Sequence, residues 1–373
     1  MVSYQNAKAL NVFYGSDRIN KIYAGSKLVY DDAHGYMWGW LQNSSNSLGL
    51  TGINYTYPEK IGNRKWLAAS MGGGFSLAID SDRHLWSCGI NNEGQLGLGD
   101  TDNRNQFTQI NSNKWDRVIC GGAHSLAIDM TGCLWAWGCN SSGELGLGDK
   151  DNRLVPEKIN DNRWLKIAAG LYHSLAIDEN GYLWAWGNNT EGQLGVSSPA
   201  NSLPYRVGTR KYVEIAAGFC HSLAIDENGY LWAWGRNTYG ECGLGYTSDA
   251  ASTNPPRTPQ RIGNKTWSKV AGGQMHSLAI DSDGYLWAWG GNNSTSAGAL
   301  GLGDTINRTS PAKVGDEKWM EIACGRHNSI GINLIGHLFL WGDQKYYTPE
   351  QIQVAKWAKI FSGPNSTGAL LIA

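Results

Sequence analysis

Two short patterns of hydrophobic and polar positions recur along most of this chain. One begins with an aromatic residue and runs through G-x-x-H-S-L-A-I-D, and the other reads L-W-A-W-G after a tight turn. The copies are numbered as repeats 1 to 7 by their first residues: Trp66, Trp115, Trp164, Tyr212, Trp267, Trp319 and Trp357. Their spacing of 38 to 55 residues is typical of propellers, solenoids or repeat arrays.

Each repeat predicts four short β-strands. Segments such as 164–169 and 173–177 combine apolar and small residues, which suits strands packed on both faces. Asp178-Glu179-Asn180-Gly181 is a turn signal, because Gly adopts positive φ and Asp bonds its own backbone. The Gly-rich stretch after each third strand is predicted to be a compact loop, since so many glycines would weaken a strand.

Repeat 7 is split between the two ends of the chain. Residues 357–373 supply only two strands, whereas Gly35–Trp40 matches the L-W-A-W-G strand and Tyr57–Ile61 matches Val155–Ile159. Residues 34–65 and 357–373 together make 49 residues, which is one full repeat. Pairing the first and last strands closes a ring and leaves only short, protected sheet edges. We therefore predict an all-β protein whose residues 34–373 form a seven-bladed β-propeller of four-stranded blades.

Composition narrows the classes of function. A net charge of -1 and a pI of about 6.7 argue against a nucleic-acid partner, which would need a basic face. The N-terminus lacks the apolar core of a secretory signal, and no segment has the length of a membrane span. Most of the 18 Trp residues recur at fixed repeat positions, which favours packing between blades over carbohydrate stacking.

Residue types that often carry chemistry have structural interpretations here. Four histidines share one repeat position: His124, His173, His221 and His276. They occur one per blade, so we expect them to bond to a neighbouring blade's backbone rather than to share a metal ion. Five aspartates end second strands, where turn chemistry explains them: Asp80, Asp129, Asp178, Asp226 and Asp281. The pairs Asp100/Arg104, Asp149/Arg153 and Asp304/Arg308 suit loop-holding ion pairs. We expect no enzyme activity, no cofactor and no metal.

The phrases G-x-x-H-S-L-A-I-D and L-W-A-W-G-x-N-x-x-G-Q-L-G-L-G-D closely resemble the regulator of chromosome condensation repeat family. The resemblance covers about nine-tenths of the chain, from Gly35 to Ala373, and implies a seven-bladed propeller. Members of that family include a nucleotide exchanger for a small GTPase and a bacterial β-lactamase inhibitory protein, and both bind proteins with the propeller face. This chain has no obvious long wedge insertion or basic tail, so exchange activity is not expected.

Positions that differ between the otherwise constant repeats are candidates for binding a partner. The two residues after the constant Gly join strands one and two, at the same end as the loops after strand three. Aromatic, Met and Arg residues, typical of binding hot spots, dominate half of this ring. The predicted partner-binding residues are Tyr172, Phe219, Met275, Arg326, His327, Arg236 and Tyr239. The alternative is that some of them only plug the mouth of the channel.

Residues 1–33 precede the repeats. Residues 18–30 predict a β-hairpin around Gly25-Ser26, and 33 residues are too few for an independent core, so we expect this segment to dock. The predicted docking residues are Ile19, Ile22, Tyr23, Leu28, Val29 and Tyr30. The phrase I-x-K-I-Y-x-G-x-K-L-V-Y resembles a short module of bacteriophage tail and fibre proteins.

Two hypotheses of function follow. The leading one is a phage structural protein of the tail, baseplate or fibre. Such a protein would be assembled in the host cytoplasm in multiple copies, with its propeller contacting a virion neighbour or the host surface. The alternative is a soluble cytoplasmic regulator or inhibitor that binds a protein partner. A lectin is the weakest hypothesis, because packing already accounts for the Trp positions.

Overall fold

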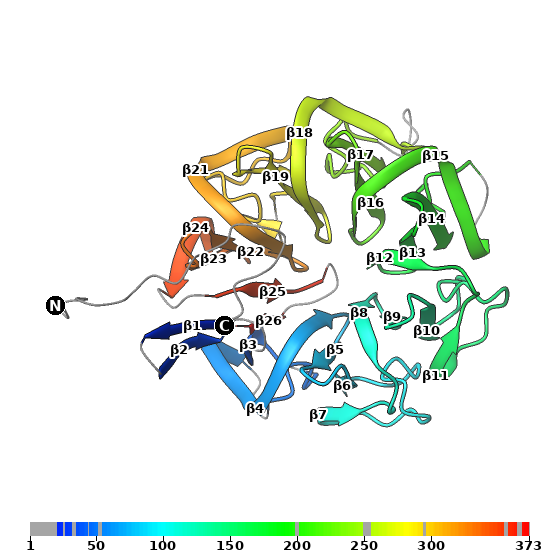
Figure 1. The fold of residues 1–373 in the computed structure, drawn as a ribbon. Coiled ribbons are helices and arrows are strands. Elements are labelled where there is room, and N and C mark those ends of the chain that lie inside the picture. Colours follow the sequence, from blue (N-terminus) through cyan, green and yellow to red (C-terminus); the bar gives the residue numbers. More distant parts are fainter. Residues whose placement is uncertain are drawn as a thin grey trace.

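The computed structural model describes residues 21–24, 27–31, 35–43, 45–50, 54–197, 201–248, 255–293, 296–353, 357–363 and 368–372. These residues form β-strands arranged as seven blades in a ring, which Figure 1 shows along its axis. Blade n takes the number of its repeat. Among the described residues there is no helix that could span a membrane.

Blade 2 shows the repeating unit most simply. It pairs β8 (Trp115–Cys120), β9 (His124–Asp129), β10 (Leu134–Gly138) and β11 (Arg153–Lys158) in antiparallel order. Blade 1 uses the end of β4 (Asn54–Met71), then β5 (Phe75–Asp80), β6 (Leu85–Gly89) and β7 (Arg104–Gln109). Blade 3 uses β12 (Trp164–Ala169), β13 (His173–Asp178), β14 (Tyr182–Gly187) and the start of β15 (Asn201–Ala217).

The remaining blades follow the same order. Blade 4 uses the end of β15, β16 (His221–Asp226), β17 (Tyr230–Gly235) and the start of β18 (Gln260–Gly272). Blade 5 uses the end of β18, β19 (His276–Asp281), β20 (Tyr285–Gly290) and the start of β21 (Arg308–Cys324). Blade 6 uses the end of β21, β22 (Asn328–Asn333), β23 (Leu338–Gly342) and β24 (Tyr346–Gln353).

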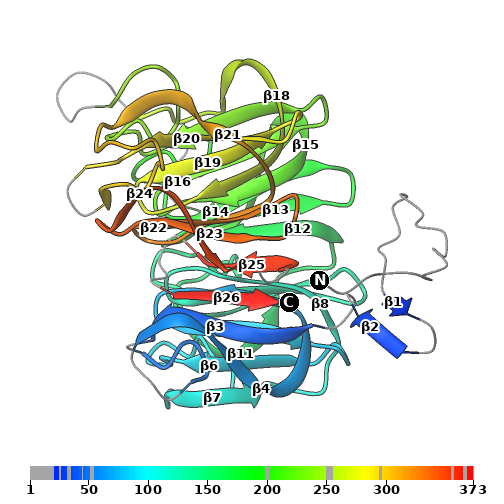
Figure 2. The same cartoon turned by 90° about the vertical axis from the view of Figure 1, so that its left-hand side faces the viewer.

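Blade 7 closes the ring as predicted. It joins β25 (Lys359–Phe361) and β26 (Gly368–Ile372) from the C-terminus to β3 (Tyr36–Gln42) and the start of β4. In the register of β26 and β3, Leu371 lies opposite Trp38 and Ala369 opposite Trp40. The side view of Figure 2 shows β26 between β25 and β3.

The hydrophobic core consists of clusters between consecutive blades. The described residues form seven such clusters, one at each junction of the ring. The cluster that joins blades 7 and 1 packs Met37 and Ile372 against Trp66 and Ala69. An open row of seven blades has only six junctions, so the seventh cluster supports ring closure independently of the strand pairing.

The four-stranded blades are as predicted, but some of their strands are longer than expected. β4, β15, β18 and β21 each run on from strand four of one blade into strand one of the next. Each of these long strands bends at a glycine with φ between 54° and 64°: Gly62, Gly208, Gly263 and Gly315. Positive φ turns the chain sharply without a separate loop.

The axis of the ring is a narrow channel. All seven inner strands line a cavity of about 200 Å³, largely with small side chains such as Ala69, Ala169 and Ala217. Pockets for drug-sized ligands usually measure about 300–1,000 Å³. The channel is therefore too small for such a ligand.

The N-terminal hairpin is also present. β1 (Lys21–Ala24) and β2 (Lys27–Asp31) pair antiparallel, with Ala24 opposite Lys27. Gly25, Ser26 and Ile19 lie outside the described residues. The docking of this hairpin and the division of the chain at residues 33 and 34 stay predictions.

Candidate functional site

Two sets of loops meet at one end of the ring, as the sequence predicted. In blade 2, His124 at the start of β9 pairs with Gly138 at the end of β10, and the N–H of Cys139 donates to the carbonyl of Ala123 at 2.9 Å. The turn between strands one and two therefore lies beside the loop after strand three. We call this end the loop face. It comprises the described turns at 72–74, 121–123, 170–172, 218–220, 273–275 and 325–327 and the loops that follow strand three.

Backbone hydrogen bonds join neighbouring turns of the loop face around the channel mouth. Gly73 N–H donates to the Gly122 carbonyl at 3.0 Å, and Gly122 N–H donates to the Gly170 carbonyl at 3.0 Å. The series continues from Leu171 to Phe219 and from Phe219 to Gly273, each at 3.1 Å. Side chains on these turns are therefore held at fixed spacing, which lowers the entropy lost when a partner binds.

The predicted partner-binding residues come from four consecutive blades, 3 to 6. Tyr172 in blade 3 is 40% exposed, and Arg326 in blade 6 is also exposed. Five others are half-buried: Phe219, Arg236, Tyr239, Met275 and His327. The structure thus brings them into one arc of the loop face. On the far side of the ring, the turns of blades 1 and 2 carry only Gly73, Gly74, Gly122 and Ala123.

Arg236 is committed to contacts within the protein. Its Nε donates to Oε1 of Glu241 at 2.8 Å, and its Nη2 donates to the carbonyl of Gln274 in the next blade. Its guanidinium lies 5.8 Å from the ring centroid of Phe219. With only 17% of its side chain exposed, Arg236 fixes the position of Phe219 and the blade 5 turn more than it offers a free charge.

Glu241 is a site residue that the sequence analysis missed. Its side chain is fully buried, and burial raises the pKa of its carboxyl, while Arg236 opposes that shift. Its Oε2 accepts the N–H of Tyr239 at 2.7 Å, so one carboxylate orients both predicted contact residues. The available signal was the combination of Glu241 with Arg236, since repeat 2 carries Glu144 with Cys139, and repeats 1 and 3 carry Gln95 and Gln193.

Met275 and Tyr239 both lie close to Gly291. A Cβ at Gly291 would be 3.0 Å from the Cβ of Met275 and 3.4 Å from that of Tyr239, so the glycine lets them approach each other. Ser296 Oγ lies 3.9 Å from Met275 Sδ and 3.4 Å from His327 Nδ1. Burial lowers the pKa of His327, and the charge of Arg326 adds to this effect. His327 is therefore neutral at neutral pH.

The four repeated histidines link blades, but the predicted acceptor was wrong. Each Nε2 lies 2.8–3.1 Å from a serine hydroxyl of the next blade, not from its backbone: Ser174, Ser222, Ser277 and Ser329. Each hydroxyl donates at 2.8 Å to a backbone carbonyl: those of Glu144, Gln193, Glu241 and Ala299. Because the hydroxyl hydrogen is used in this way, Nε2 must be the donor to serine.

Burial keeps these histidines neutral. It lowers the pKa of His124, His173 and His276 to about 3, and that of His221 well below its usual value. The constant glycine before each histidine is required by packing, because a Cβ at Gly121 would lie 2.1 Å from the His124 ring. These histidines therefore serve as neutral donors between blades.

The repeated aspartates hold turns, as predicted, and they also accept hydrogen bonds from tryptophan indoles of the same blade. In blade 3, Asp178 Oδ1 accepts the N–H groups of Asn180 and Tyr182, and Oδ2 accepts the N–H of Trp184 Nε1 at 2.9 Å.

Asp80, Asp82 and His84 are close enough to hold a metal ion. However, Asp80 already accepts hydrogen bonds from Arg64 and Trp86, and His84 Nε2 lies 2.9 Å from Lys114 Nζ. This donor set does not suit a cation.

The predicted loop-holding ion pairs are confirmed. Asp100 and Arg104, Asp149 and Arg153, and Asp304 and Arg308 each approach to 2.6 Å.

At the end of the ring opposite the loop face, a cleft of about 460 Å³ is also lined by charged residues. Its charges include the ion pairs of Lys166 with Glu214 at 2.5 Å and Arg83 with Asp116 at 2.8 Å.

The predicted docking residues of the hairpin are only partly placed. Ile22, Tyr23, Leu28, Val29 and Tyr30 lie in β1 and β2, but the contacts of their side chains lie outside what the structure describes. Their role in docking therefore remains a prediction.

Comparison with known proteins finds relatives of the repeat sequence. A stretch of 90 residues is 32% identical to the ultraviolet-B receptor UVR8 of Arabidopsis thaliana, covering 23% of this chain and 20% of UVR8. A stretch of 73 residues is 36% identical to protein RCC2 of Homo sapiens, covering 19% of this chain and 13% of RCC2. The matched stretches thus span a fifth or less of these two curated relatives.

Similarity of fold extends much further than these stretches. Prp20p of Saccharomyces cerevisiae superposes with a TM-score of 0.80 at 22% identity, over 91% of each chain. Residues 34–353 match the family model described as RCC1-like domain. Since this match includes six blades and part of the seventh, the chain belongs to the RCC1-like domain family.

Proposed function

We propose that this protein is a non-enzymatic binding module that holds a protein partner on the arc of its loop face formed by blades 3 to 6. The observation that supports this proposal is the contrast around the ring. Aromatic, Met and Arg side chains fill the turns of blades 3 to 6, whereas Gly and Ala occupy those of blades 1 and 2. Buried aromatic and Arg anchors supply most of the binding energy at protein interfaces.

The absence of reactive geometry among the described candidates supports a non-enzymatic role. The repeated histidines donate to serines, and the described turn aspartates accept turn N–H groups and indoles. Each of these groups already takes part in a hydrogen bond within the protein. We infer a regulator or inhibitor that acts by holding its partner.

Two solved structures of similar fold support a protein partner. Prp20p of yeast binds Gsp1p and histones, and another structure contains Kap60 bound to yeast RCC1 (Prp20). These partners are those of the yeast protein. For this chain they support only the class of partner, because similarity at 21–22% identity extends to the fold alone.

The test is affinity capture from the source organism followed by quantitative mass spectrometry. The loop-face variant carries alanine at Tyr172, Phe219 and Arg326. The matched control carries alanine at Leu165, Val213 and Leu334, which are 49%, 50% and 60% exposed. These three residues lie at the opposite end of their blades from the loop face. We expect the loop-face variant to lose at least about tenfold of the captured partner, since hot-spot truncations cost about 2 kcal/mol or more. Loss in the control alone would overturn the proposal.

A role as a virion component is the second candidate. The hairpin of β1 and β2 and the phrase in residues 19–30 favour it, whereas the comparisons give it no support. It is tested by mass spectrometry of purified particles that carry either the full chain or a chain lacking residues 1–33. Hairpin-dependent incorporation would support this candidate, and absence of both chains from particles would exclude it.

A further inference from the structure

One position of strand one forms a ring of seven side chains around the axis, at the end of the propeller opposite the loop face. Each of these residues lies opposite an isoleucine of strand two in its own blade. In blade order they are Ala68, Arg117, Lys166, Glu214, Lys269, Glu321 and Lys359. Because the seven share one register, their charges can be compared blade by blade.

Two ion pairs in this ring cross from one blade to the next. Lys166 of blade 3 donates to Oε2 of Glu214 in blade 4 at 2.5 Å. Lys269 of blade 5 donates in the same way to Oε1 of Glu321 in blade 6. A lysine at this position therefore reaches the ring position of the following blade and meets a carboxylate there.

Blade 1 breaks this pattern. Lys359 of blade 7 is the third lysine of the ring, but the following blade carries Ala68, which supplies no carboxylate. Lys359 nevertheless reaches blade 1, because its Nζ donates to the carbonyl of Leu67 at 2.7 Å. The place where blades 4 and 6 hold a carboxylate is therefore left open above Ala68, within reach of an ammonium group.

Ala68 lines the cleft of about 460 Å³ at this end of the ring. This volume lies in the range of known ligand pockets. Ala69, Ile119 and Phe361 line both the cleft and the axial channel, so the cleft is the wider mouth of the channel. These side chains provide an apolar floor beside the charged ring.

The cleft carries an excess of positive charge. Its described lining contains four cations and two carboxylates: Arg83, Arg117, Lys166, Lys359, Asp116 and Glu214. Asp116 is shared by two arginines, with Oδ1 at 2.8 Å from Arg83 and Oδ2 at 3.3 Å from Nε of Arg117. The side chain of Arg117 is 52% exposed, and its contact with Asp116 uses one of the five N–H donors of a guanidinium. Arg117 can therefore also bind an anion in the cleft.

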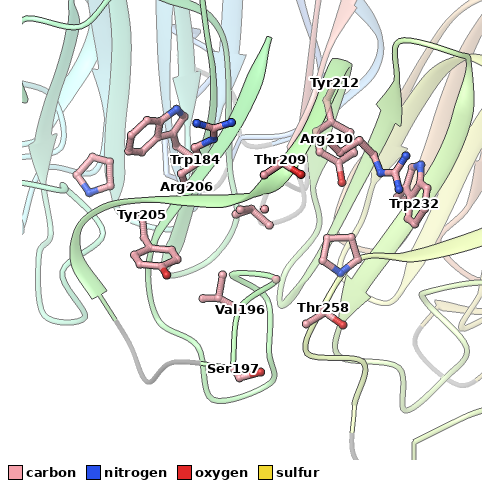
Figure 3. Close-up of a pocket in the computed structure, with 15 residues that line it drawn as sticks. Trp184, Val196, Ser197, Tyr205, Arg206, Thr209, Arg210, Tyr212, Trp232 and Thr258 are labelled. Atoms are coloured by element: carbon pink, nitrogen blue, oxygen red, sulfur yellow. The ribbon is translucent and has the colours of Figure 1, made fainter. Parts of the chain in front are cut away.

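A larger groove between blades 3 and 4, of about 890 Å³, does not offer its cations in this way. Arg206 stacks on Tyr182 at 3.5 Å from the ring centroid, and its Nε is buried. Arg210 is paired with Asp226 at 3.4 Å and stacks on Trp232, beside which Figure 3 shows it. The positive charge that a ligand can reach is therefore in the cleft at the channel mouth.

We propose that this cleft binds the carboxylate of a ligand above Ala68, between Lys359 and Arg117, with an apolar part of the same ligand against Ile119 and Phe361. The carboxylate takes the place that Glu side chains occupy in blades 4 and 6. Hydrogen bonds from an ammonium and a guanidinium to a carboxylate are charge-assisted and strong. The site lies at the other end of the channel from the loop face, so it goes beyond the function proposed above.

Two sources could supply this carboxylate, a small organic acid or an acidic side chain of a bound protein. The probes are phenylacetate for the first and an acetylated Leu-Glu-Leu amide for the second, with phenylacetamide and Leu-Gln-Leu as neutral counterparts. Binding to the purified full chain is measured by ligand-observed NMR titration. The acid of the matching source is expected to bind at least about tenfold more tightly than its neutral counterpart. The tighter of the two acids identifies the source.

Three variants test the residues of the site. Lys359→Met and Arg117→Met are each expected to weaken binding of the acid at least about tenfold. Ala68→Glu supplies the carboxylate from the chain itself, so it is expected to abolish binding. The matched control is Lys269→Met, which removes the same charge from the ring outside the cleft lining and should leave binding unchanged.

Thermal unfolding checks that each variant is folded. Absence of binding of both acids to the wild type would overturn the proposal, as would equal binding of the acids and their neutral counterparts. Undiminished binding by Ala68→Glu would overturn it as well. So would an equal loss in Lys269→Met and Lys359→Met, because such a loss would depend on the overall charge rather than on this cleft.

Discussion

Lowering the pH from 7.5 to 5.0 is expected to remove a large part of the free energy of unfolding. His124, His173 and His276 have folded pKa values of about 3 because they are buried, against 6.5 for an unperturbed histidine. As the pH falls below 6.5, the unfolded state binds protons that the folded state does not. The stability that these residues contribute is therefore complete above pH 6.5 and is lost progressively as the pH falls from 6.5 towards 3.

The magnitude follows from the linkage relation. At pH 5.0, which is 1.5 units below the unfolded pKa, each of these histidines costs about 2 kcal/mol at 1.36 kcal/mol per unit. Three of them cost about 6 kcal/mol, and His221 acts in the same direction. Domains usually have a total stability of about 5–15 kcal/mol, so this loss should be conspicuous.

The assay is urea-induced unfolding at both pH values, compared between the wild type and His124→Asn. Asparagine is the residue that blade 6 already carries at this position, as Asn328. The variant should lose about 2 kcal/mol less than the wild type on acidification, whatever its stability at pH 7.5. The raised pKa values of Glu144 and Glu241 act in the opposite direction and cancel in this comparison. An identical loss of stability in both proteins would refute the inference that His124 is buried and neutral in the folded state.

Three further outcomes are expected. Truncation before Trp357 should lower the melting temperature by more than about 10 °C, because it removes two strands and exposes sheet edges. Arg236→Met should cost about 3 kcal/mol in urea unfolding by leaving buried Glu241 unpaired, and adding Glu241→Gln should recover most of this loss. Trp135→Phe should cost about 1–2 kcal/mol by removing the 2.8 Å donor to Asp129, and adding Asp129→Asn should reduce the cost.

Each of these outcomes has a result that would contradict its reasoning. Equal melting temperatures of the full and truncated chains would argue against ring closure through blade 7. If the two double variants were no more stable than their single Arg236 and Trp135 variants, the pairings would not be coupled. The native chain provides a precedent for the second pair, since blade 6 replaces both members together, with Asn333 and Phe339.

The repeat pattern was sufficient to predict the fold. The phrase recurs with little variation, so blade number, strand order and closure followed from its spacing and from the match of Gly35–Trp40 to the L-W-A-W-G strand. The ion pairs were also predictable, because their partners lie four residues apart in one loop. Both inferences depend on local sequence.

Contacts between blades were harder to predict. The donation of His124 to Ser174 spans 50 positions, and its geometry depends on how one blade is rotated against the next. The role of Glu241 depends on its pairing with Arg236, because repeat 2 carries the equivalent Glu144 but has Cys139 at the position of Arg236. Comparison of repeats gave the useful signal, namely Arg236 at the position where repeat 2 has Cys139.

Site-specific photo-crosslinking shows which surface of the propeller contacts a protein partner. A photoreactive phenylalanine analogue is placed at Tyr172 on the loop face and, in a matched protein, at Leu165, which is exposed at the other end of β12. Crosslinked proteins from the source organism are then identified by mass spectrometry. We expect a discrete protein adduct at position 172 and none at 165. An adduct at 165 alone would contradict the assignment of the loop face as the protein-binding surface.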